Sequence, residues 1–207
     1  MSKTAYELEW KRQKQRTGLP AGHIPVHRWY LRLDEPWAVE ARTPPLENLI
    51  LMRAEQPTIS FYRFLYHTAG EDYVWGNRRR MSDEILASIL ARDDTHVMVL
   101  YKSGTPVGFF EVDFSAADST EIKYFALLPG NIGLGLGGYM LNCAIRHAGQ
   151  SKLPVILDTC TLDHGSALEN YLKRGFVIYD RQDEEYPDPR LDGTMPRHAG
   201  KHVPLAE

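Results

Sequence analysis

The sequence predicts an α/β domain in which helices cover both faces of a mixed central sheet. From residue 57 onward, apolar residues follow helical or strand periodicity in the order helix, helix, strand, strand, strand, helix, strand, helix, strand. A hairpin-type turn joins the first two of these strands, and the later strands alternate with helices, as in parallel β-α-β units. The chain has 207 residues, 43% of them hydrophobic and 25% charged, which suits one such domain.

Composition and charge argue against several other classes of protein. The net charge is −3 and basic residues form no stripe, so we expect no nucleic-acid partner. No apolar run approaches the roughly 20 residues of a membrane helix. The first residues also lack the apolar core of a signal peptide. We therefore expect no membrane association and a cytoplasmic location.

The cysteines and histidines give no metal or redox signature. Cys143 and Cys160 lie in apolar stretches outside any Cys-x-x-Cys pair, which is typical of buried structural thiols in a reducing compartment. The histidines show no ligand spacing, and Asp163-His164 has no second ligand at helical spacing. The sequence therefore predicts no metal site.

The first 45 residues are expected to form an N-terminal arm or extension. Residues 4–16 are helix-prone but mostly charged, and their apolar side chains do not complete a helical stripe. Prolines and glycines then interrupt the chain, and residues 27–33 alternate loosely enough for an early strand. We expect residues 46–207 to be the folded domain.

Two helices and three strands are predicted between residues 46 and 118. Pro57 suits the first turn of a helix that continues through residue 68. Ser82 is a good N-cap for the second helix, with apolar residues at 85, 86, 89 and 90 as its buried stripe. The strands are expected at residues 49–53, 97–101 and 107–114.

The next part of the chain alternates strands and helices. Helices are expected at residues 134–148 and 166–174, each followed by a glycine that suits a helix end. Strands are expected at residues 121–128 and 154–159, and a further strand starts at residue 176. The tail from Asp180 is acidic, rich in proline and loop-like, with residues 202–205 as a candidate edge strand.

A glycine-rich stretch joins the strand at residues 121–128 to the following helix. It reads Leu127-Leu128-Pro129-Gly130-Asn131-Ile132-Gly133-Leu134-Gly135-Leu136-Gly137-Gly138. Glycine lets the backbone curl, and the first N–H groups of a helix have no partner within the helix. Together with the positive end of the helix dipole they form an anion site that suits a pyrophosphate.

Three interpretations of this stretch compete. A dinucleotide fold requires Gly-x-Gly-x-x-Gly and an acid about 20 residues later; Asp158 lies near that distance, but the third glycine has the wrong spacing. A nucleotide-phosphate loop requires Gly-Lys-Ser/Thr, which is absent. A turn that only packs a helix closely against a strand is the interpretation without a ligand.

The stretch also resembles the acetyl-CoA motif of the GNAT superfamily of N-acetyltransferases, Gln/Arg-x-x-Gly-x-Gly/Ala after Val-x-Pro. Leu127-Leu128-Pro129 leads in, Gly133, Gly135 and Gly137 form the glycine run, and Ile132 replaces Gln or Arg. A second motif agrees with the first. The strand at residues 155–159, followed by His164, Ala167, Tyr171 and Gly175-Phe176, is similar to the family's strand, Asn-x-x-Ala-x-x-x-Tyr helix and Gly-Phe ending, with His164 in place of Asn.

The resemblance covers about residues 47–180 and implies a three-layer GNAT-like fold. It implies an acceptor-side half at about 46–118, an acetyl-CoA-binding half at about 119–180 and a C-terminal tail at 181–207. It also allows for a homodimer, because dimers are common among such folds. The cofactor-binding residues that it implies are Leu127, Leu128, Gly133, Leu134, Gly135, Leu136, Gly137, Gly138, His164 and Tyr171.

The resemblance also implies roles in catalysis. Glu121 stands where the histone-acetylating branch of the family has its general base, although a salt bridge with Lys123, two residues on, is an equally weighted alternative. Glu111 on the neighbouring strand is the rival base, or a carboxylate that attracts a cationic amine. Tyr171 is the expected acid for the departing thiolate, because an ordinary phenol is protonated at neutral pH.

The expected activity is acetyl-CoA-dependent N-acetylation of a primary amine by direct attack in a ternary complex, without a metal. Transfer of a longer acyl group is one alternative, and a non-catalytic CoA-binding regulatory module is another. Tyr73 and Trp75 lie outside any regular pattern and are expected in the wall of the acceptor pocket. The arginines at 78–80 suit either an anionic substrate or a solvated face.

Overall fold

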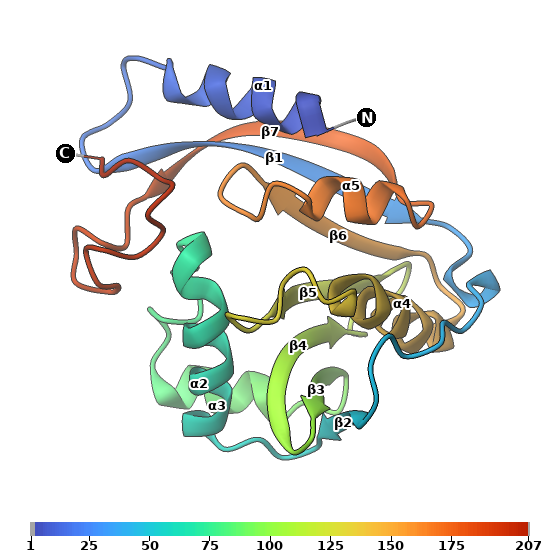
Figure 1. Ribbon diagram of the computed structural model, residues 1–207. Coiled ribbons are helices and arrows are strands. Elements are labelled where there is room, and N and C mark those ends of the chain that lie inside the picture. Colours follow the sequence, from blue (N-terminus) through green and yellow to red (C-terminus); the bar gives the residue numbers. More distant parts are fainter. Residues whose placement is uncertain (1–2, 207) are drawn as a thin grey trace. The chain divides into compact units, whose positions relative to one another are not determined.

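The computed structural model describes residues 3–206 (Figure 1). The chain divides into two compact units. The first comprises the described residues up to Arg32, Gly70–Arg80 and the residues from Asp158 onward. The second comprises Leu33–Ala69 and Met81–Leu157. The family motifs found in the sequence are therefore divided, with the glycine-rich stretch in the second unit and Tyr171 in the first.

Helices and strands alternate along the chain largely as predicted. Antiparallel and parallel strand pairs both occur, and the strand order is β2-β3-β4-β5-β6-β1-β7. The elements are α1 (Lys3–Lys14), β1 (His23–Leu33), β2 (Leu49–Ala54), α2 (Ile59–Gly70), α3 (Asp83–Leu90), β3 (Thr95–Lys102), β4 (Thr105–Asp113), β5 (Thr120–Leu127), α4 (Leu136–Ala148), β6 (Val155–Cys160), α5 (Ala167–Leu172) and β7 (Val177–Pro187).

In the second unit, helices pack on opposite faces of the strands. Strands β2, β3, β4 and β5 pair antiparallel in succession. Gly108 of β4 faces α4, because a Cβ atom there would lie 2.8 Å from the sulfur of Met140. The next residue, Phe109, points to the other face, and its ring centroid lies 6.4 Å from that of Tyr62 in α2. The mixed sheet with helices on both faces is therefore confirmed.

In the first unit, β1 and β7 form a long antiparallel pair. Val26 and Leu31 of β1 are fully buried, so this part of the N-terminal segment belongs to a core rather than to an external arm. Pairing with β7 makes this segment a strand. The loose alternation of residues 27–33 by itself predicts a strand only weakly. The domain boundary at residue 45 stays a prediction.

The expectation of a loop from Asp180 onward is wrong for residues 180–187, whereas the described residues after Pro187 are turns and coil as expected. Residues 180–187 continue β7, and their acidic side chains find basic partners on β1. The guanidinium of Arg28, for example, donates to Glu184 at 2.8 Å and also bonds Asp158. Charged side chains are common on strands that keep one face in water, so acidic composition was a poor guide here. The candidate strand at residues 202–205 is also wrong, because these residues form a turn and coil.

Beyond β7, a buried ion pair organises the tail. Arg190 donates to the carboxylate of Asp188 at 2.7 and 2.8 Å, and both side chains are almost fully buried. The same guanidinium donates to the carbonyls of Ala199 at 3.2 Å, Val203 at 2.7 Å and Pro204 at 2.8 Å. A guanidinium offers five N–H donors. Here they connect three backbone carbonyls of the tail to Asp188.

The helix predicted after Ser82 has the expected N-cap but only part of the expected buried stripe. The Ser82 hydroxyl accepts a hydrogen bond from the N–H of Ile85, so the predicted N-cap is confirmed. Leu86 and Leu90 are buried as expected, but Ile85 is 53% exposed. The helix α3 is short, so the narrow apolar stripe formed by Leu86 and Leu90 is enough to pack it against the sheet.

Two histidines meet in the second unit where α4 crosses β3. Nδ1 of His96 lies 2.8 Å from Nε2 of His147, and aromatic rings of Phe110 and Phe114 surround the pair. Burial, followed by the nearby charges of His96 and Arg53, lowers the pKa of His147 to about 4. Burial also lowers the pKa of His96. One of the two rings donates and the other accepts, so the contact requires at least one neutral ring.

We expect stability to fall as the pH drops from about 6.5 to about 4. An unfolded histidine takes up a proton near its ordinary pKa of about 6.5, whereas folded His147 stays neutral to about 4. Protons therefore favour the unfolded chain in this window, by about 1–2 kcal/mol for a partly buried ring. Urea unfolding at pH 5 and pH 7 measures this loss. His147→Leu should reduce the loss of stability between pH 7 and pH 5. His198→Gln, which changes a largely exposed ring, should not. An equal loss in the wild type and both variants would contradict the assignment of this effect to His147.

Candidate active site

The glycine-rich loop enters α4 through two residues with positive φ. Gly133 has φ +88° and Gly135, the residue before the helix, has φ +77°. No side chain caps the N-terminus of α4. The N–H groups of its first turn, from Leu136 to Gly138, cannot be satisfied within the helix. The loop therefore presents backbone donors at the positive end of a helix dipole, as an anion site requires.

The edge of β5 next to this loop carries outward-directed backbone groups. Leu128 donates its N–H to the carbonyl of Val107 on β4 at 2.9 Å. Because successive residues of a strand direct their backbone groups to opposite sides, the N–H and C=O of Leu127 point away from β4. The parallel register with β6 covers only Thr120 and Glu121, at the other end of β5, in the described chain.

Leu128 has less to offer a ligand than Leu127. Its N–H is taken by Val107, and its carbonyl accepts from the backbone N–H of Asn131 at 3.3 Å and the side-chain amide at 3.1 Å. These bonds fold the chain back at the start of the loop. Contact between a cofactor and the backbone of Leu127 or Leu128 stays a prediction, and the hydrogen bonds favour Leu127.

A β-bulge decides which way Glu121 faces. On the β4 side, Glu111 pairs with Tyr124 and the following residue, Val112, pairs with Ile122, so Lys123 is the additional residue on β5. Without the bulge, Glu121 and Tyr124 would point to opposite faces, because they are three residues apart. With it, Glu121 pairs with Asp113 and shares the face of Glu111 and Tyr124.

The Glu121 carboxylate pairs with the ammonium of Lys123. Both side chains are about one-third exposed, so this ion pair lies near water and contributes little stability by itself. The salt bridge considered from the sequence is thus present. Its presence leaves Glu121 able to accept a hydrogen bond from a further donor, because a carboxylate has about four acceptor sites.

Glu111 is in a different environment from Glu121. It is 1% exposed, and it accepts a hydrogen bond of 2.5 Å from the hydroxyl of Tyr62, itself fully buried on α2. Tyr62 stacks with Tyr66, whose ring meets that of Tyr124 edge-on at 5.0 Å. The burial and the bond from Tyr62 give Glu111 a structural role that sequence reasoning did not anticipate.

In the first unit, the loop before α5 holds His164. Nδ1 of His164 accepts from the backbone N–H of Ser166 at 3.3 Å and lies 2.8 Å from its hydroxyl. The preceding side chain, Asp163, accepts from Thr159 at 2.7 Å and from the N–H of Cys160 at 3.0 Å. The carboxylate of Asp163 thus fixes the turn, and the ring of His164 caps it from the exposed side.

Tyr171 lies on the buried side of α5. Its ring is 6% exposed and meets Phe176 edge-on at 6.1 Å. Burial raises the pKa of the Tyr171 hydroxyl, and the carboxylates of Asp163 and Asp158 raise it further. The phenol is therefore protonated at every physiological pH, as a proton donor must be before it acts.

The other sequence-predicted groups also lie in the first unit. Tyr73 and Trp75 are neighbours, with ring centroids 6.4 Å apart, and burial raises the pKa of Tyr73 to about 12. Arg78 is buried, and Arg80 pairs with Asp192 at 2.9 Å. Since Arg78 is buried, the three arginines do not all lie on a solvated face.

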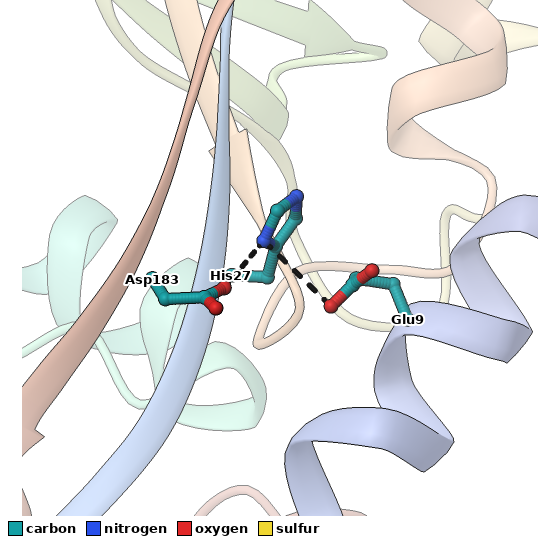
Figure 2. A group of neighbouring side chains, drawn as sticks. All are labelled: Glu9, His27 and Asp183. Carbon is teal, nitrogen blue, oxygen red and sulfur yellow. Dashed lines mark hydrogen bonds and ion pairs between the residues drawn. The ribbon is translucent and has the colours of Figure 1, made fainter.

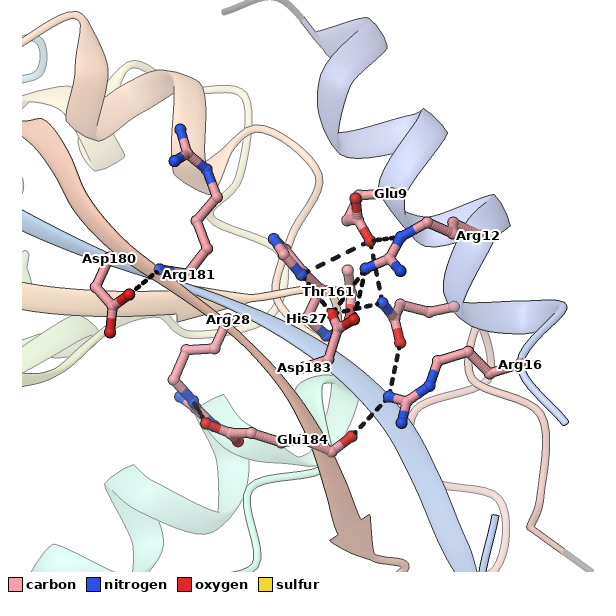
Figure 3. Close-up of polar contacts among 11 residues, drawn as sticks. Glu9, Arg12, Arg16, His27, Arg28, Thr161, Asp180, Arg181, Asp183 and Glu184 are labelled. Carbon is pink, nitrogen blue, oxygen red and sulfur yellow. Dashed lines mark hydrogen bonds and ion pairs between the residues drawn. The ribbon is translucent and has the colours of Figure 1, made fainter. Parts of the chain in front are cut away.

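One cluster brings together atoms of the types that bind metals. Glu9, His27 and Asp183 each place one such atom within 4.8 Å of the others (Figure 2). Arg12 bonds both carboxylates, at 2.5 Å to Glu9 and 2.7 Å to Asp183 (Figure 3). The side-chain amide of Gln13 donates to both at 3.0 Å. Although partial burial opposes it, Arg12 and His27 lower the pKa of Asp183 to about 2. The carboxylates already have donors, and we assign the cluster to docking of α1 on β1 and β7.

One comparison with known proteins identifies a family. A model described as the acetyltransferase (GNAT) family matches residues 61–176. A comparison with curated protein sequences finds no match. None of the helices in the described part of the chain combines the length and apolar character needed to cross a bilayer.

Solved structures show the same fold at low sequence identity. A functionally unknown conserved protein from Staphylococcus epidermidis ATCC 12228 has a TM-score of 0.60 and 17% identity, covering 81% of this chain and 63% of that one. A GCN5-related N-acetyltransferase from Kribbella flavida has a TM-score of 0.56 and 15% identity, covering 83% and 63%. One from Sphaerobacter thermophilus has a TM-score of 0.53 and 15% identity, covering 89% and 56%. The chain thus spans less than two thirds of the length of each of these structures.

Proposed function

The chain belongs to the GNAT acetyltransferase family, and from this premise we propose that it transfers an acetyl group from acetyl-CoA to a primary amine. The observation that carries the proposal is the loop geometry. Gly133 and Gly135 have positive φ, and they lead into an N-terminus of α4 that no side chain caps. In our proposal the pyrophosphate of acetyl-CoA accepts from the N–H groups of this turn. The outward-directed backbone groups of Leu127 then bind the amides of the pantetheine arm.

Ile132 bears on the strength of this binding. It stands where the family usually has Gln or Arg, and it is 49% exposed. An apolar side chain gives no charge-assisted bond to a phosphate, so in our proposal the backbone carries the contact alone. His164 replaces the family's Asn, and its ring already accepts from Ser166. We propose that it contacts the cofactor through its other nitrogen, Nε2.

The proposed reaction is direct attack in a ternary complex. The neutral amine attacks the thioester carbonyl carbon, a C–N bond forms and the C–S bond breaks. Glu121 accepts a proton from the amine, directly or through one water. Tyr171 donates a proton to the departing thiolate, and its raised pKa keeps the phenol protonated until that step. Backbone N–H groups stabilise the developing oxyanion.

The proposal is tested by following thiol release from acetyl-CoA with the purified protein and a panel of primary amines. The panel includes a polyamine, an aminoglycoside, amino acids, peptide N-termini and a lysine peptide. Amine-dependent thiol release is the expected result. Acetyl-CoA binding without release across the panel would instead identify a CoA-binding module. A larger rate with a longer acyl-CoA would identify a different acyl donor.

A matched pair of glycine variants tests whether the glycine-rich loop binds acetyl-CoA. Gly133 and Gly104 have similar φ values, +88° and +84°, and both offer open space for a Cβ atom. Alanine should strain the backbone by about 1–2 kcal/mol at either position. Gly133→Ala should weaken acetyl-CoA binding about tenfold by calorimetry, whereas Gly104→Ala, in the β3–β4 turn, should not. Equal affinity of the two variants would contradict phosphate binding by the loop.

A further inference from the structure

A cavity in the first unit belongs to none of the groups proposed for acetyl transfer. Its volume is about 420 Å³, which lies in the range of small-molecule sites. It is lined by residues from α1, by the segment that leads into β1, and by Pro204, Leu205 and Ala206 of the tail. No lining residue comes from the glycine-rich loop, β5 or α5.

Hydrogen bonds hold the walls of this cavity in place. Gly22 donates its N–H to the carbonyl of Ala206 at 3.1 Å, and Asp188 donates its N–H to the carbonyl of Gly22 at 2.9 Å. The N–H of Ala206 in turn reaches the Asp188 carboxylate at 3.3 Å. Arg190 fixes Pro204 by a bond of 2.8 Å to its carbonyl. The tail is therefore fastened to the start of β1, and the cavity does not depend on a loose segment for its shape.

The charged side chains among the described residues that line the cavity are basic. Lys14 and Arg16 line it together with His23, and no described lining residue is acidic, although the whole chain has a net charge of −3. The ammonium of Lys14 lies 4.7 Å from the centroid of the Trp10 ring. Within the described chain no carboxylate pairs with Lys14. Arg16 is partly compensated, because Glu185 lies 3.6 Å away.

The remaining wall is apolar. Trp10, Leu19, Ile24 and Leu205 contribute hydrocarbon and ring surface, together with prolines. His23 adds a polar atom. Its Nδ1 lies 3.0 Å from the carbonyl of Ala21, and since a carbonyl only accepts, Nδ1 carries the proton. Nε2 of His23 then becomes a donor only when the ring is protonated.

We propose that this cavity binds a small organic anion, a carboxylate or sulfonate on an apolar ring or branched hydrocarbon. Lys14 is the main partner of the anionic group, and Arg16 supports it. Trp10, Leu19 and Leu205 enclose the apolar body. A neutral molecule of the same shape leaves Lys14 without a counter-charge, and an inorganic anion leaves the apolar wall empty, so both bind more weakly.

The test compares two dyes with the same aromatic rings. 1-Anilinonaphthalene-8-sulfonate carries one negative charge, and N-phenyl-1-naphthylamine lacks the sulfonate. We expect saturable one-to-one fluorescence enhancement with the sulfonate and weaker binding of the neutral dye. Phenylacetate should displace the sulfonate dye, whereas phenylacetamide should not. Equal affinity for the two dyes, or displacement by both competitors, would overturn the proposal.

Two lysines of the same helix provide the matched variants. Both are exposed on α1, but Lys14 lines the cavity and Lys11 does not. Lys14→Gln should weaken binding of the sulfonate dye about tenfold, the effect of one charge-assisted bond. Lys11→Gln removes the same charge from the same helix and should leave the affinity unchanged. If both variants bind as the wild type does, or both weaken equally, Lys14 is not the partner and the proposal fails.

Discussion

Replacing Glu121 by glutamine is expected to lower kcat by about 10²–10⁴-fold at neutral pH while leaving acetyl-CoA affinity nearly unchanged. The amide has the size of the carboxylate but cannot accept the amine proton. Binding of acetyl-CoA should survive, because our proposal assigns it to the backbone of the loop and to Leu127. Thiol release measures kcat, and calorimetry measures the affinity.

Lys123→Gln is the control for this prediction. Glu121 and Lys123 form an ion pair near water, and either substitution breaks it. If Glu121 has only this structural role, the two variants should behave alike. If it is the base, only Glu121→Gln should lose turnover, together with the fall in rate that protonation of a base causes at acidic pH. Full activity of Glu121→Gln would remove this residue from the mechanism.

Glu111→Gln separates the rival base from a structural carboxylate. Glu111 is buried and accepts from Tyr62. An amide oxygen can still accept that bond, so a structural role predicts a change in stability with the pH profile of turnover unchanged. A base predicts loss of the acidic limb of the profile. Glu111 and Glu121 lie on the same face of the sheet, so position alone does not distinguish the base from the structural carboxylate.

Arg190→Ala is expected to destabilise the protein by about 3–5 kcal/mol, the effect of breaking a buried ion pair. Asp188 would keep a buried charge without its partner, and the carbonyls of Ala199, Val203 and Pro204 would each lose a donor. Since a domain is stable by only about 5–15 kcal/mol, this loss is a large fraction of the total. Urea unfolding measures it.

Two variants control for this effect. Lys173→Ala breaks an exposed pair with Glu169 on α5, and it should cost less than about 1 kcal/mol. The double variant Asp188→Asn with Arg190→Met removes both buried charges, and it should be more stable than Arg190→Ala alone. An Arg190→Ala protein as stable as Lys173→Ala would show that the tail does not depend on this pair.

Much of the fold follows from local patterns. The N-cap at Ser82 was predictable because capping involves neighbours a few residues apart. The glycine-rich loop and the start of α4 were predictable for the same reason, since glycine at positive φ is a local requirement. Residues 180–187 were not, because their acidic composition resembles a loop and only pairing with β1 makes them a strand.

The candidate site divides in the same way. Sequence alone proposed Glu121, Tyr171 and the loop as site residues, because similar residues recur at fixed spacing in a known family. It missed the bond from Tyr62 to Glu111, which joins residues 49 positions apart. It also gave no sign of the bulge at Lys123, which places Glu121 on the face of Glu111 and Tyr124.

The sequence by itself predicted most of the order of elements and the family, and it led to the proposal of an anion site at the loop, because each depends on residues close together in the chain. Only the tertiary structure decided the face that Glu121 shares with Glu111, the docking of α1 and the basic cavity. The contact of His27 with Asp183 joins residues 156 positions apart, and the cavity joins residues 10–25 to residues 204–206. Such contacts are set by strand register and packing, and these depend on partners that no local pattern specifies.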